Sequence, residues 1–177
     1  MIYEPREDSV LLKKWVKKLV KGKVLDMGTG SGVQALAALE KTKDVLAADI
    51  NPECVEYVKK KGVNALQSDL FSNITEKFDW IIFNPPYLPE DLEEPEDSKL
   101  STTGGVEGNE ILLEFLLRAK AHLNTNGKIL IVISSLTGEA EELFTDYSWK
   151  ELETQKLFFE ELTVYELSLK EDLYFRK

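Results

Sequence analysis

The segment Asp26-Met27-Gly28-Thr29-Gly30-Ser31-Gly32 decides the fold, because it places a turn of alternating glycines between a strand and a helix. Residues 24–27 are predicted to form a short strand, and the residues from about 33 to 40 have helical character. Glycine reaches positive φ without steric cost and lets the backbone approach a ligand closely. Open α/β sheets bind ligands at the carboxyl ends of their strands, so we expect this turn to border a binding site.

Outward from this turn, short strand-like runs alternate with segments of helical period. This pattern predicts one domain over residues 1–177, with an α/β fold. We expect a seven-stranded, mostly parallel sheet with helices on both faces and an antiparallel strand at one edge. The expected strands are 24–27, 44–49, 63–67, 79–83, 128–134, 152–158 and 162–169. The expected helices are about 11–19, 33–40, 51–62, 111–123 and 139–144, the third capped by Asn51 and begun by Pro52.

The composition excludes several classes of chemistry. The chain has one histidine, His122, and one cysteine, Cys54, whereas a zinc site of the usual type needs about four such ligands. Nucleophilic schemes that need a histidine would all depend on His122, which we interpret as a structural residue in a helix. A lone cysteine suits a reducing compartment, and the acidic N-terminus does not resemble an export signal, so we expect a cytoplasmic protein.

The charge balance and hydropathy constrain the partners. Lys and Arg number 22 against 32 Asp and Glu, which gives a net charge of −10. Direct binding of nucleic acid is disfavoured because it gains affinity from a basic surface. A small molecule, a basic protein or a folded partner is a better match. No apolar run approaches the roughly 20 residues of a membrane span, so no membrane partner is expected.

Three acids end or follow three of the predicted strands. They are Asp26, Asp49 and Asp69. Each alone also suits a helix cap or a loop, but together with the glycine turn they suit a ligand that carries positive charge and hydroxyl groups. The turn lacks the Gly-Lys-Ser/Thr ending of a phosphate-binding loop and the Gly-x-Gly-x-x-Gly spacing of a dinucleotide site. S-adenosylmethionine, which has a sulfonium, an ammonium and no phosphate, is the predicted cofactor.

A second motif, Asn84-Pro85-Pro86-Tyr87, directly follows the fourth predicted strand. Asn and Pro both favour turns, so the simplest interpretation is a turn. However, two prolines fix φ and remove two N–H donors, which leaves a rigid segment that mainly accepts hydrogen bonds. The Asn84 side-chain oxygen and the Pro85 carbonyl can accept hydrogen bonds from both hydrogens of a planar –NH2 group. Tyr87 can stack on this group. The motif therefore predicts methylation of an amide or amine nitrogen, helped by positioning and polarisation.

These two motifs together resemble the class I methyltransferases that have a Rossmann-like fold and modify exocyclic or amide nitrogens. Two further stretches, Tyr3–Ser9 and Gly104–Gly108, resemble the HemK-type protein glutamine-N5 methyltransferases. The resemblance runs from Tyr3 to about Ser134. It departs from the family at Ser9, where Thr is frequent, and at Glu107, where Asp is common.

The resemblance implies specific roles and partners. The implied substrate is the Gly-Gly-Gln loop of a peptide chain release factor. The short form, without the bacterial substrate-recognition domain, resembles the archaeal and eukaryotic branch. That branch pairs with a small zinc-binding activator through the edge strand, here Val63–Gln67. The residues implied to contact the cofactor are Ser9, Asp26, Gly28, Gly30, Asp49, Asp69 and Asn84, and those implied to hold the substrate are Asn84, Pro85, Pro86 and Tyr87.

Other interpretations stay open at this point. Adenine N6, cytosine N4 and guanine N2 are planar amino groups too, so a nucleic-acid methyltransferase is the main rival, although such an enzyme must grip a backbone and flip a base. A lysine or small-molecule methyltransferase is a lesser variant. A binding module that keeps the fold without turnover is a third class. The acidic residues between Glu90 and Asp97 are interpreted as a solvated loop, with a lid for a basic substrate as the alternative.

Overall fold

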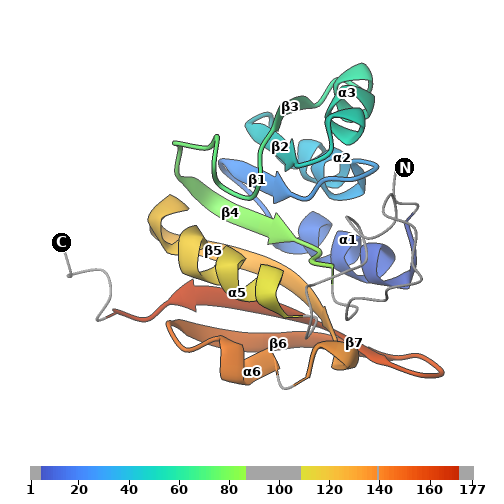
Figure 1. Cartoon of the computed structure of the whole chain (residues 1–177), viewed down its shortest axis with the longest axis vertical. Coiled ribbons are helices and arrows are strands. Elements are labelled where there is room, and N and C mark those ends of the chain that lie inside the picture. Colours follow the sequence, from blue (N-terminus) through green and yellow to red (C-terminus); the bar gives the residue numbers. More distant parts are fainter. Residues whose placement is uncertain (1–4, 87–108, 139, 172–177) are drawn as a thin grey trace.

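The computed structural model describes residues 5–86, 109–138 and 140–171. Its seven-stranded sheet has the order β3-β2-β1-β4-β5-β7-β6 (Figure 1). Strands β1 to β5 run parallel, and β7 runs antiparallel to both β5 and the edge strand β6. The strands are β1 Val24–Met27, β2 Val45–Asp49, β3 Asn64–Gln67, β4 Phe78–Phe83, β5 Leu123–Ser134, β6 Tyr147–Lys156 and β7 Glu161–Leu169. The predicted fold class is confirmed.

Helices cover both faces of the sheet, as predicted. On one face α1, α2 and α3 pack on an aliphatic core, and on the other face α5 and α6 pack on a core rich in phenylalanine. The bounds are α1 Glu7–Leu19, α2 Val33–Leu39, α3 Pro52–Lys60, α5 Glu110–Ala119 and α6 Ala140–Leu143, with short 3-10 turns η1 Lys120–His122 and η2 Ser135–Thr137. Within the described residues, every helix is too short or too polar to cross a membrane.

The alternation of side chains along the strands places Asp26, Asp49 and Asn84 on the same face of the sheet. Trp80 and Ile82 of β4 lie in the core under α1 and α2, whereas Ile81 and Phe83 lie in the core under α5. Successive strand residues point to opposite faces. Residue 84, the next along β4, is therefore directed to the α1–α2 face. The same alternation directs Asp26 and Asp49 there, because their neighbours along β1 and β2 lie in the phenylalanine-rich core.

Several predicted element boundaries were wrong. The helix expected over 111–123 ends at Ala119, and Leu123 already pairs with Phe78 as the first residue of β5. The start of β5 could not be recognised from the sequence, because the pairing between β4 and β5 is interrupted after Leu123. Pairing resumes only at Lys128, after Asn126 with φ +64° and Gly127, where a Cβ would lie 2.8 Å from the Phe78 carbonyl oxygen.

Both ends of β6 were also wrong, because the strand was expected over residues 152–158 and spans Tyr147–Lys156. The strand ends at Lys156, because the Leu157 N–H donates to the Glu160 carbonyl at 2.8 Å and closes the hairpin turn there. The apolar run that suggested a longer strand therefore lies in a turn. Asn51, by contrast, caps α3 as predicted, and its side chain accepts from the Glu53 N–H at 2.9 Å.

Candidate active site

The site lies where the order of the strands reverses. From β1 the chain adds β2 and β3 on one side of the sheet, and then β4 and β5 on the other. Such a switch point leaves a crevice beyond the carboxyl ends of the two central strands. Met27 of β1 pairs with Phe83 of β4, so the glycine turn and Asn84 leave neighbouring strands at the same level (Figure 1).

The glycine turn adopts a backbone that other residues rarely adopt. Gly28, Gly30 and Gly32 have φ values of +62°, +52° and +82°. A Cβ on Gly32 would also meet Val58 Cγ1 at 2.8 Å, so this glycine permits close packing of the turn against α3. The alternation of glycines seen in the sequence therefore reflects three left-handed positions in a single turn.

Asp26 lies beneath this turn and holds it. Its side chain is 1% exposed, and its Oδ2 accepts hydrogen bonds from Thr29 Oγ1 at 2.6 Å and from the Ala35 N–H at 3.0 Å. Burial raises the pKa of Asp26 to about 7, the two hydrogen bonds oppose this shift, and the nearby Asp49 adds to it. Sequence reasoning directed this carboxylate at a ligand, but one of its oxygens instead ties the turn to α2. Thr29 was missed, although its place three residues after Asp26 was a usable signal.

Asp49 pins the same turn from the end of β2. Its Oδ2 accepts from the Gly30 N–H at 2.8 Å, and its Oδ1 accepts from the Asn51 N–H at 2.9 Å. The carboxylate is largely buried, and this burial raises its pKa. Two buried carboxylates, Asp26 and Asp49, thus lie next to one glycine turn, an arrangement that suits a cationic ligand.

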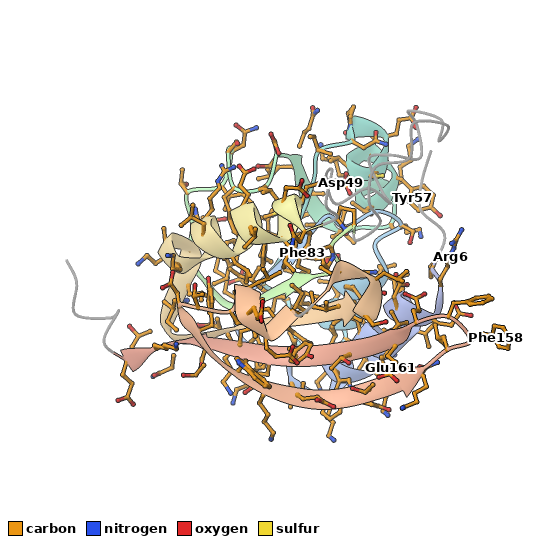
Figure 2. The ribbon with its side chains drawn as sticks, turned by 60° about the horizontal axis from the view of Figure 1, so that its bottom comes forward. Arg6, Asp49, Tyr57, Phe83, Phe158 and Glu161 are labelled. Carbon is orange, nitrogen blue, oxygen red and sulfur yellow. The ribbon has the colours of Figure 1, made fainter. Side chains whose placement is uncertain are left out.

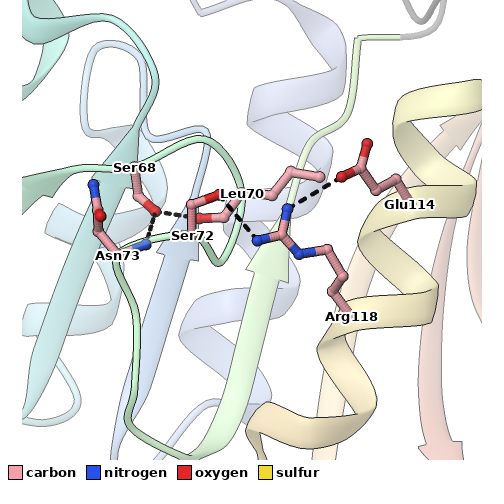
Figure 3. Close-up of polar contacts among 6 residues, drawn as sticks. All are labelled: Ser68, Leu70, Ser72, Asn73, Glu114 and Arg118. Atoms are coloured by element: carbon pink, nitrogen blue, oxygen red, sulfur yellow. Dashed lines mark hydrogen bonds and ion pairs between the residues drawn. The ribbon is translucent and has the colours of Figure 1, made fainter.

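Asp69 lies on a tight turn after β3 and is exposed. Ser68 closes this turn, because its Oγ donates to the Leu70 carbonyl at 2.6 Å and accepts from the Asn73 N–H at 3.0 Å (Figure 3). Leu70 itself has φ +45°, an unusual value for a leucine. Ser68 was not predicted from the sequence, yet it fixes the backbone that carries Asp69.

Arg118 of α5 braces the turn that carries Asp69. Its Nη2 donates to Ser72 Oγ at 3.0 Å, and its Nη1 contacts Glu114 Oε1 at 3.1 Å (Figure 3). The arginine therefore connects the turn to a helix on the phenylalanine-rich face. This contact joins segments 46 residues apart, which no local sequence pattern reports.

The Asn84 side chain meets the N-terminal helix. Its Nδ2 lies 3.5 Å from Ser9 Oγ, and the Ser9 carbonyl accepts from Gln34 Nε2 at 2.9 Å. Ser9 and Gln34 are buried. Among the residues that the structure describes, none donates to the buried Asn84 Oδ1. Gln34 was missed by sequence reasoning, although a single amide in the apolar helix Val33–Leu39 was a signal that could have found it.

Of the remaining residues of the Asn84–Tyr87 motif, the structure describes Pro85 and Pro86 but not Tyr87. Pro85 is buried and Pro86 half-buried, directly after Asn84. Tyr87, the acidic segment 90–97 and the stretch Gly104–Gly108 lie outside the described residues, as does Tyr3. The structure thus brings together Ser9, Asp26, Gly28, Gly30, Asp49 and Asn84 at one edge of the sheet, with Asp69 on the adjoining turn.

The surroundings of His122 and Cys54 are those of structural residues. His122 Nδ1 lies 2.9 Å from the Glu76 carbonyl oxygen, and its ring stacks on Phe71 with centroids 4.5 Å apart. The structural interpretation of this histidine is confirmed. Cys54 is buried in α3, and burial raises the pKa of its thiol to about 11, which disfavours the thiolate.

A family model described as the methyltransferase small domain matches residues 7–156. The chain belongs to this family. Membership makes it a methyltransferase, as the glycine turn, the strand-end acids and the Asn-Pro-Pro-Tyr motif predicted. The match includes α1, the glycine turn, Asn84 and every strand from β1 to β6.

The chain is also similar in sequence to three named methyltransferases. A protein of Methanocaldococcus jannaschii, provisionally named a protein N5-glutamine methyltransferase, is 40% identical over 80% of this chain and 77% of its own. A release factor glutamine methyltransferase of Lactococcus lactis is 33% identical over 70% of this chain and 53% of its own. The ribosomal RNA small subunit methyltransferase C of Haemophilus influenzae is 33% identical over 77% of this chain and 41% of its own. The chain spans about half the length of these two bacterial relatives.

A solved structure shares the architecture over nearly its full length. It is a chain of the E. cuniculi Mtq2–Trm112 complex, which is described as responsible for the methylation of the eRF1 translation termination factor. That chain is 25% identical, the alignment covers 96% of this chain and 99% of that one, and the TM-score is 0.78. The methyltransferase small domain described above is thus similar to a solved methyltransferase from end to end.

Proposed function

We propose that this methyltransferase transfers a methyl group from S-adenosylmethionine to the side-chain amide nitrogen of the glutamine in the Gly-Gly-Gln loop of a peptide chain release factor. The observation that carries this proposal is the state of Asn84, whose Oδ1 is buried and accepts no hydrogen bond from the described residues. A buried acceptor without a donor costs about 1–3 kcal/mol. An incoming –NH2 group supplies the missing donor.

The orientation of the Asn84 amide follows from its contact with Ser9. Because Nδ2 is directed to the Ser9 hydroxyl, Oδ1 is the atom left for the substrate. Pro85 and Pro86 contribute no N–H donors, so the backbone here can only accept. The Asn84 side chain and the Pro85 carbonyl together match the two hydrogens of a planar primary amide. Tyr87, directly next in the chain, is proposed to stack on that amide.

Asp49 and the glycine turn form the proposed cofactor site. Both Asp49 oxygens already accept backbone N–H groups, but each keeps a lone pair that can accept from a ribose hydroxyl. Gly28 and Gly30 let the backbone approach the amino-acid end of the ligand, and Asp69 accepts from the adenine amino group. Ser9 adds a hydroxyl at the same edge. The raised pKa of the buried Asp26 and Asp49 indicates electrostatic strain that a cationic ligand relieves.

The reaction needs positioning more than acid–base chemistry. When bound, the cofactor supplies a methyl group on a positively charged sulfur. Asn84 and Pro85 would hold the amide nitrogen that takes this methyl group in exchange for one proton, which water would accept. Asn84 and Pro85 polarise the nitrogen by accepting its hydrogens and hold it in line, which reduces the entropic part of the barrier. This scheme assigns no role to His122 or Cys54, in agreement with their structural surroundings.

The choice of a protein glutamine over a nucleic-acid base rests on charge and on relatives. The relative that is 40% identical is provisionally named for glutamine N5, and the matching Mtq2–Trm112 structure concerns a termination factor. The ribosomal RNA relative keeps the amino-group alternative in view. A net charge of −10 opposes binding to a phosphate backbone, whereas it favours a basic protein substrate. Because release factors act at the ribosome, we place the reaction in the cytoplasm.

We further propose that a small activator protein, of zinc-binding type according to the sequence resemblance, pairs with the segment Val63–Gln67. In the described part of the chain, β3 is the edge of the sheet and pairs only with β2. An exposed edge strand offers unpaired N–H and C=O groups to a partner strand. We expect co-expression with such a partner to raise the yield and activity of this chain. Equal yield and activity of the isolated chain would count against the pairing.

The proposed function is tested by a competition of acceptors. The protein, with and without the activator, is incubated with methyl-labelled S-adenosylmethionine and a release factor, a histone tail, tRNA or duplex DNA. We expect label on the release factor alone, located by mass spectrometry at the Gly-Gly-Gln glutamine. A release factor altered to Gly-Gly-Glu keeps the loop but lacks the –NH2 group, so it should take no label. Label on tRNA or DNA, or equal label on the altered factor, would show that the acceptor is wrong.

A further inference from the structure

The hairpin that joins β6 to β7 carries two exposed aromatic side chains at its tip. Phe158 is 92% exposed and Phe159 is 86% exposed. Their rings contact each other edge to face, with centroids 4.6 Å apart and planes at 85°. Figure 2 shows Phe158 standing out from the end of the hairpin. Phenylalanine is a residue type that folding usually buries, so two adjacent exposed rings indicate a binding surface.

The tip is attached firmly to the end of β5. The Ser134 hydroxyl donates to the Glu160 carboxylate, and the Glu161 N–H donates to Ser135 Oγ at 3.0 Å. The turn is also closed by the hydrogen bond from Leu157 to Glu160 described above. The aromatic pair is therefore presented in a fixed place, which lowers the entropy lost when a partner binds.

The register shows that the tip extends beyond the active-site edge of the sheet. Ile131 of β5 pairs with Phe83, the residue before Asn84, and Ser134 lies three residues further along β5. At about 3.3 Å per residue this is roughly 10 Å past the level of Phe83. Because Ser134 pairs with Leu162, the turn is further out still. In Figure 1 the arrowheads of β1 and β4 and the turn of the hairpin point to the same side.

We propose that Phe158 and Phe159, the aromatic tip, form the docking surface for the body of the protein whose glutamine is methylated. The inference rests on the proposed function and deepens it by naming where the substrate protein is held. A tip at this distance from Asn84 cannot touch a small acceptor or a single amide, but it lies within the footprint of a protein. Exposed aromatic side chains on a rigid support are typical anchors of protein interfaces, where they fill apolar hollows.

The charges around the aromatic tip select a protein over a nucleic acid. Glu160 and Glu161 are its nearest ionisable neighbours along the chain in the C-terminal direction, and Lys156 is paired with Glu161 at 3.0 Å. Stacking platforms for single-stranded nucleic acid combine aromatic residues with a basic groove. Among the described residues next to the aromatic tip in the chain there are two glutamates and one lysine, so an apolar hollow flanked by basic groups on the substrate protein is the matching surface.

The test separates docking from chemistry. The double variant F158A/F159A is compared with the wild type and with Leu117→Ala, which removes another exposed apolar side chain (65% exposed) from α5. Steady-state rates are measured with an intact release factor and with a short peptide that contains Gly-Gly-Gln. We expect F158A/F159A to raise KM for the intact factor about tenfold or more with little change in kcat. We expect kcat/KM for the peptide to stay unchanged, and Leu117→Ala to match the wild type throughout.

Other outcomes overturn the inference. An unchanged KM for the intact factor means that the aromatic tip does not dock it. An equal loss with the peptide means that the tip acts on the reaction itself. A loss of RNA binding, or a change from dimer to monomer in light scattering with KM unaltered, assigns the tip to RNA or to a second copy. If the wild type fails to methylate the release factor in either form, the proposed function fails first, and the docking assignment fails with it.

Discussion

Ser9 and Asn84 are 75 residues apart in the sequence, yet the Ser9 hydroxyl lies 3.5 Å from the Asn84 amide nitrogen. One residue belongs to the first turn of α1 and the other follows β4. Gln34 extends this connection by donating to the Ser9 carbonyl from α2. Helix α1 thus sets the orientation of the amide that we assign to substrate binding, and α2, which holds Ser9 through Gln34, also holds the glycine turn through the bond from the Ala35 N–H to Asp26.

Removal of the Ser9 hydroxyl should disturb Asn84 without removing it. We expect Ser9→Ala to lower kcat about tenfold, because the Asn84 amide loses the contact that fixes its orientation. Ser9→Thr keeps a hydroxyl and serves as the matched control, with a rate near that of the wild type. Initial rates with saturating S-adenosylmethionine measure both. Equal rates for the alanine and threonine variants would mean that the hydroxyl has no positioning role.

Asn84→Ala tests the acceptor itself. Loss of Oδ1 removes an interaction that we assign to the reacting nitrogen, so we expect kcat to fall by about 100-fold or more. The affinity for S-adenosylmethionine, measured by isothermal titration, should change only a few-fold, because Asp49 and the glycine turn remain. A normal rate of methylation in this variant would disprove the mechanism.

Asp49→Asn should act on the cofactor. The substitution keeps an oxygen that can accept a backbone N–H group but removes the negative charge and one acceptor, so we expect S-adenosylmethionine to bind about 10- to 100-fold more weakly. Asp44→Asn, at an exposed aspartate just before β2, is the control and should bind normally. Isothermal titration distinguishes the two, and equal affinities would remove Asp49 from the proposed site.

The buried Asp26 makes a prediction about pH. Because its pKa is raised from 3.8 to about 7 in the folded protein, the folded state binds a proton that the unfolded state has already released between these values. The free energy of unfolding should therefore fall as the pH rises from about 4 to about 7. Asp26→Asn keeps an acceptor for Thr29 and removes the charge, so we expect it to stabilise the cofactor-free protein at pH 8 by on the order of 2–4 kcal/mol.

Thermal denaturation at a series of pH values measures this effect. The difference between Asp26→Asn and the wild type should be small at pH 4 and grow towards pH 8. Saturating S-adenosylmethionine should reduce the difference, because a cation near Asp26 favours its ionised form. A difference that does not depend on pH would mean that Asp26 does not titrate in this range.

Two glycines with the same backbone conformation distinguish the energetic cost of backbone strain from the cost of steric crowding. Gly32 and Gly62 have φ values of +82° and +83°, but a Cβ would meet Val58 Cγ1 at 2.8 Å in Gly32 and nothing within 4 Å in Gly62. We expect Gly62→Ala to cost about 1 kcal/mol of unfolding free energy and Gly32→Ala about 2–3 kcal/mol more. Urea denaturation of both variants measures these costs. Equal costs would show that Val58 moves aside freely.

The sequence predicted the parts of the site that follow from local rules. Strand runs, the alternating glycines and the acids at strand ends depend on neighbours in the chain, and they located Asp26, Asp49 and Asn84 correctly at one edge of the sheet. The burial of Asn84 Oδ1 depends on packing, which no motif describes. Gln34 was missed because its partner, the Ser9 carbonyl, is 25 residues away and belongs to another helix.

The interrupted start of β5 was missed for a related reason. Asn124 to Gly127 resembles a turn in isolation, and only the pairing of Leu123 with Phe78 makes it part of a strand. The surroundings of Asp26 were predicted in part. The sequence shows an acid before a glycine turn, but whether its oxygens face outward or hold Thr29 and the Ala35 N–H depends on how α2 packs against β1.

The shared direction of Asp26, Asp49 and Asn84 has an evolutionary consequence. Because side chains alternate along a strand, insertion or deletion of one residue within β4 would turn Asn84, and every β4 side chain after the change, to the opposite face of the sheet. Lineages can therefore exchange apolar residues within these strands with little harm, whereas a change in strand length by an odd number would silence the enzyme in one step. Natural variants of this protein should differ in the side chains of β1, β2 and β4. The lengths of these strands should differ only by even numbers of residues.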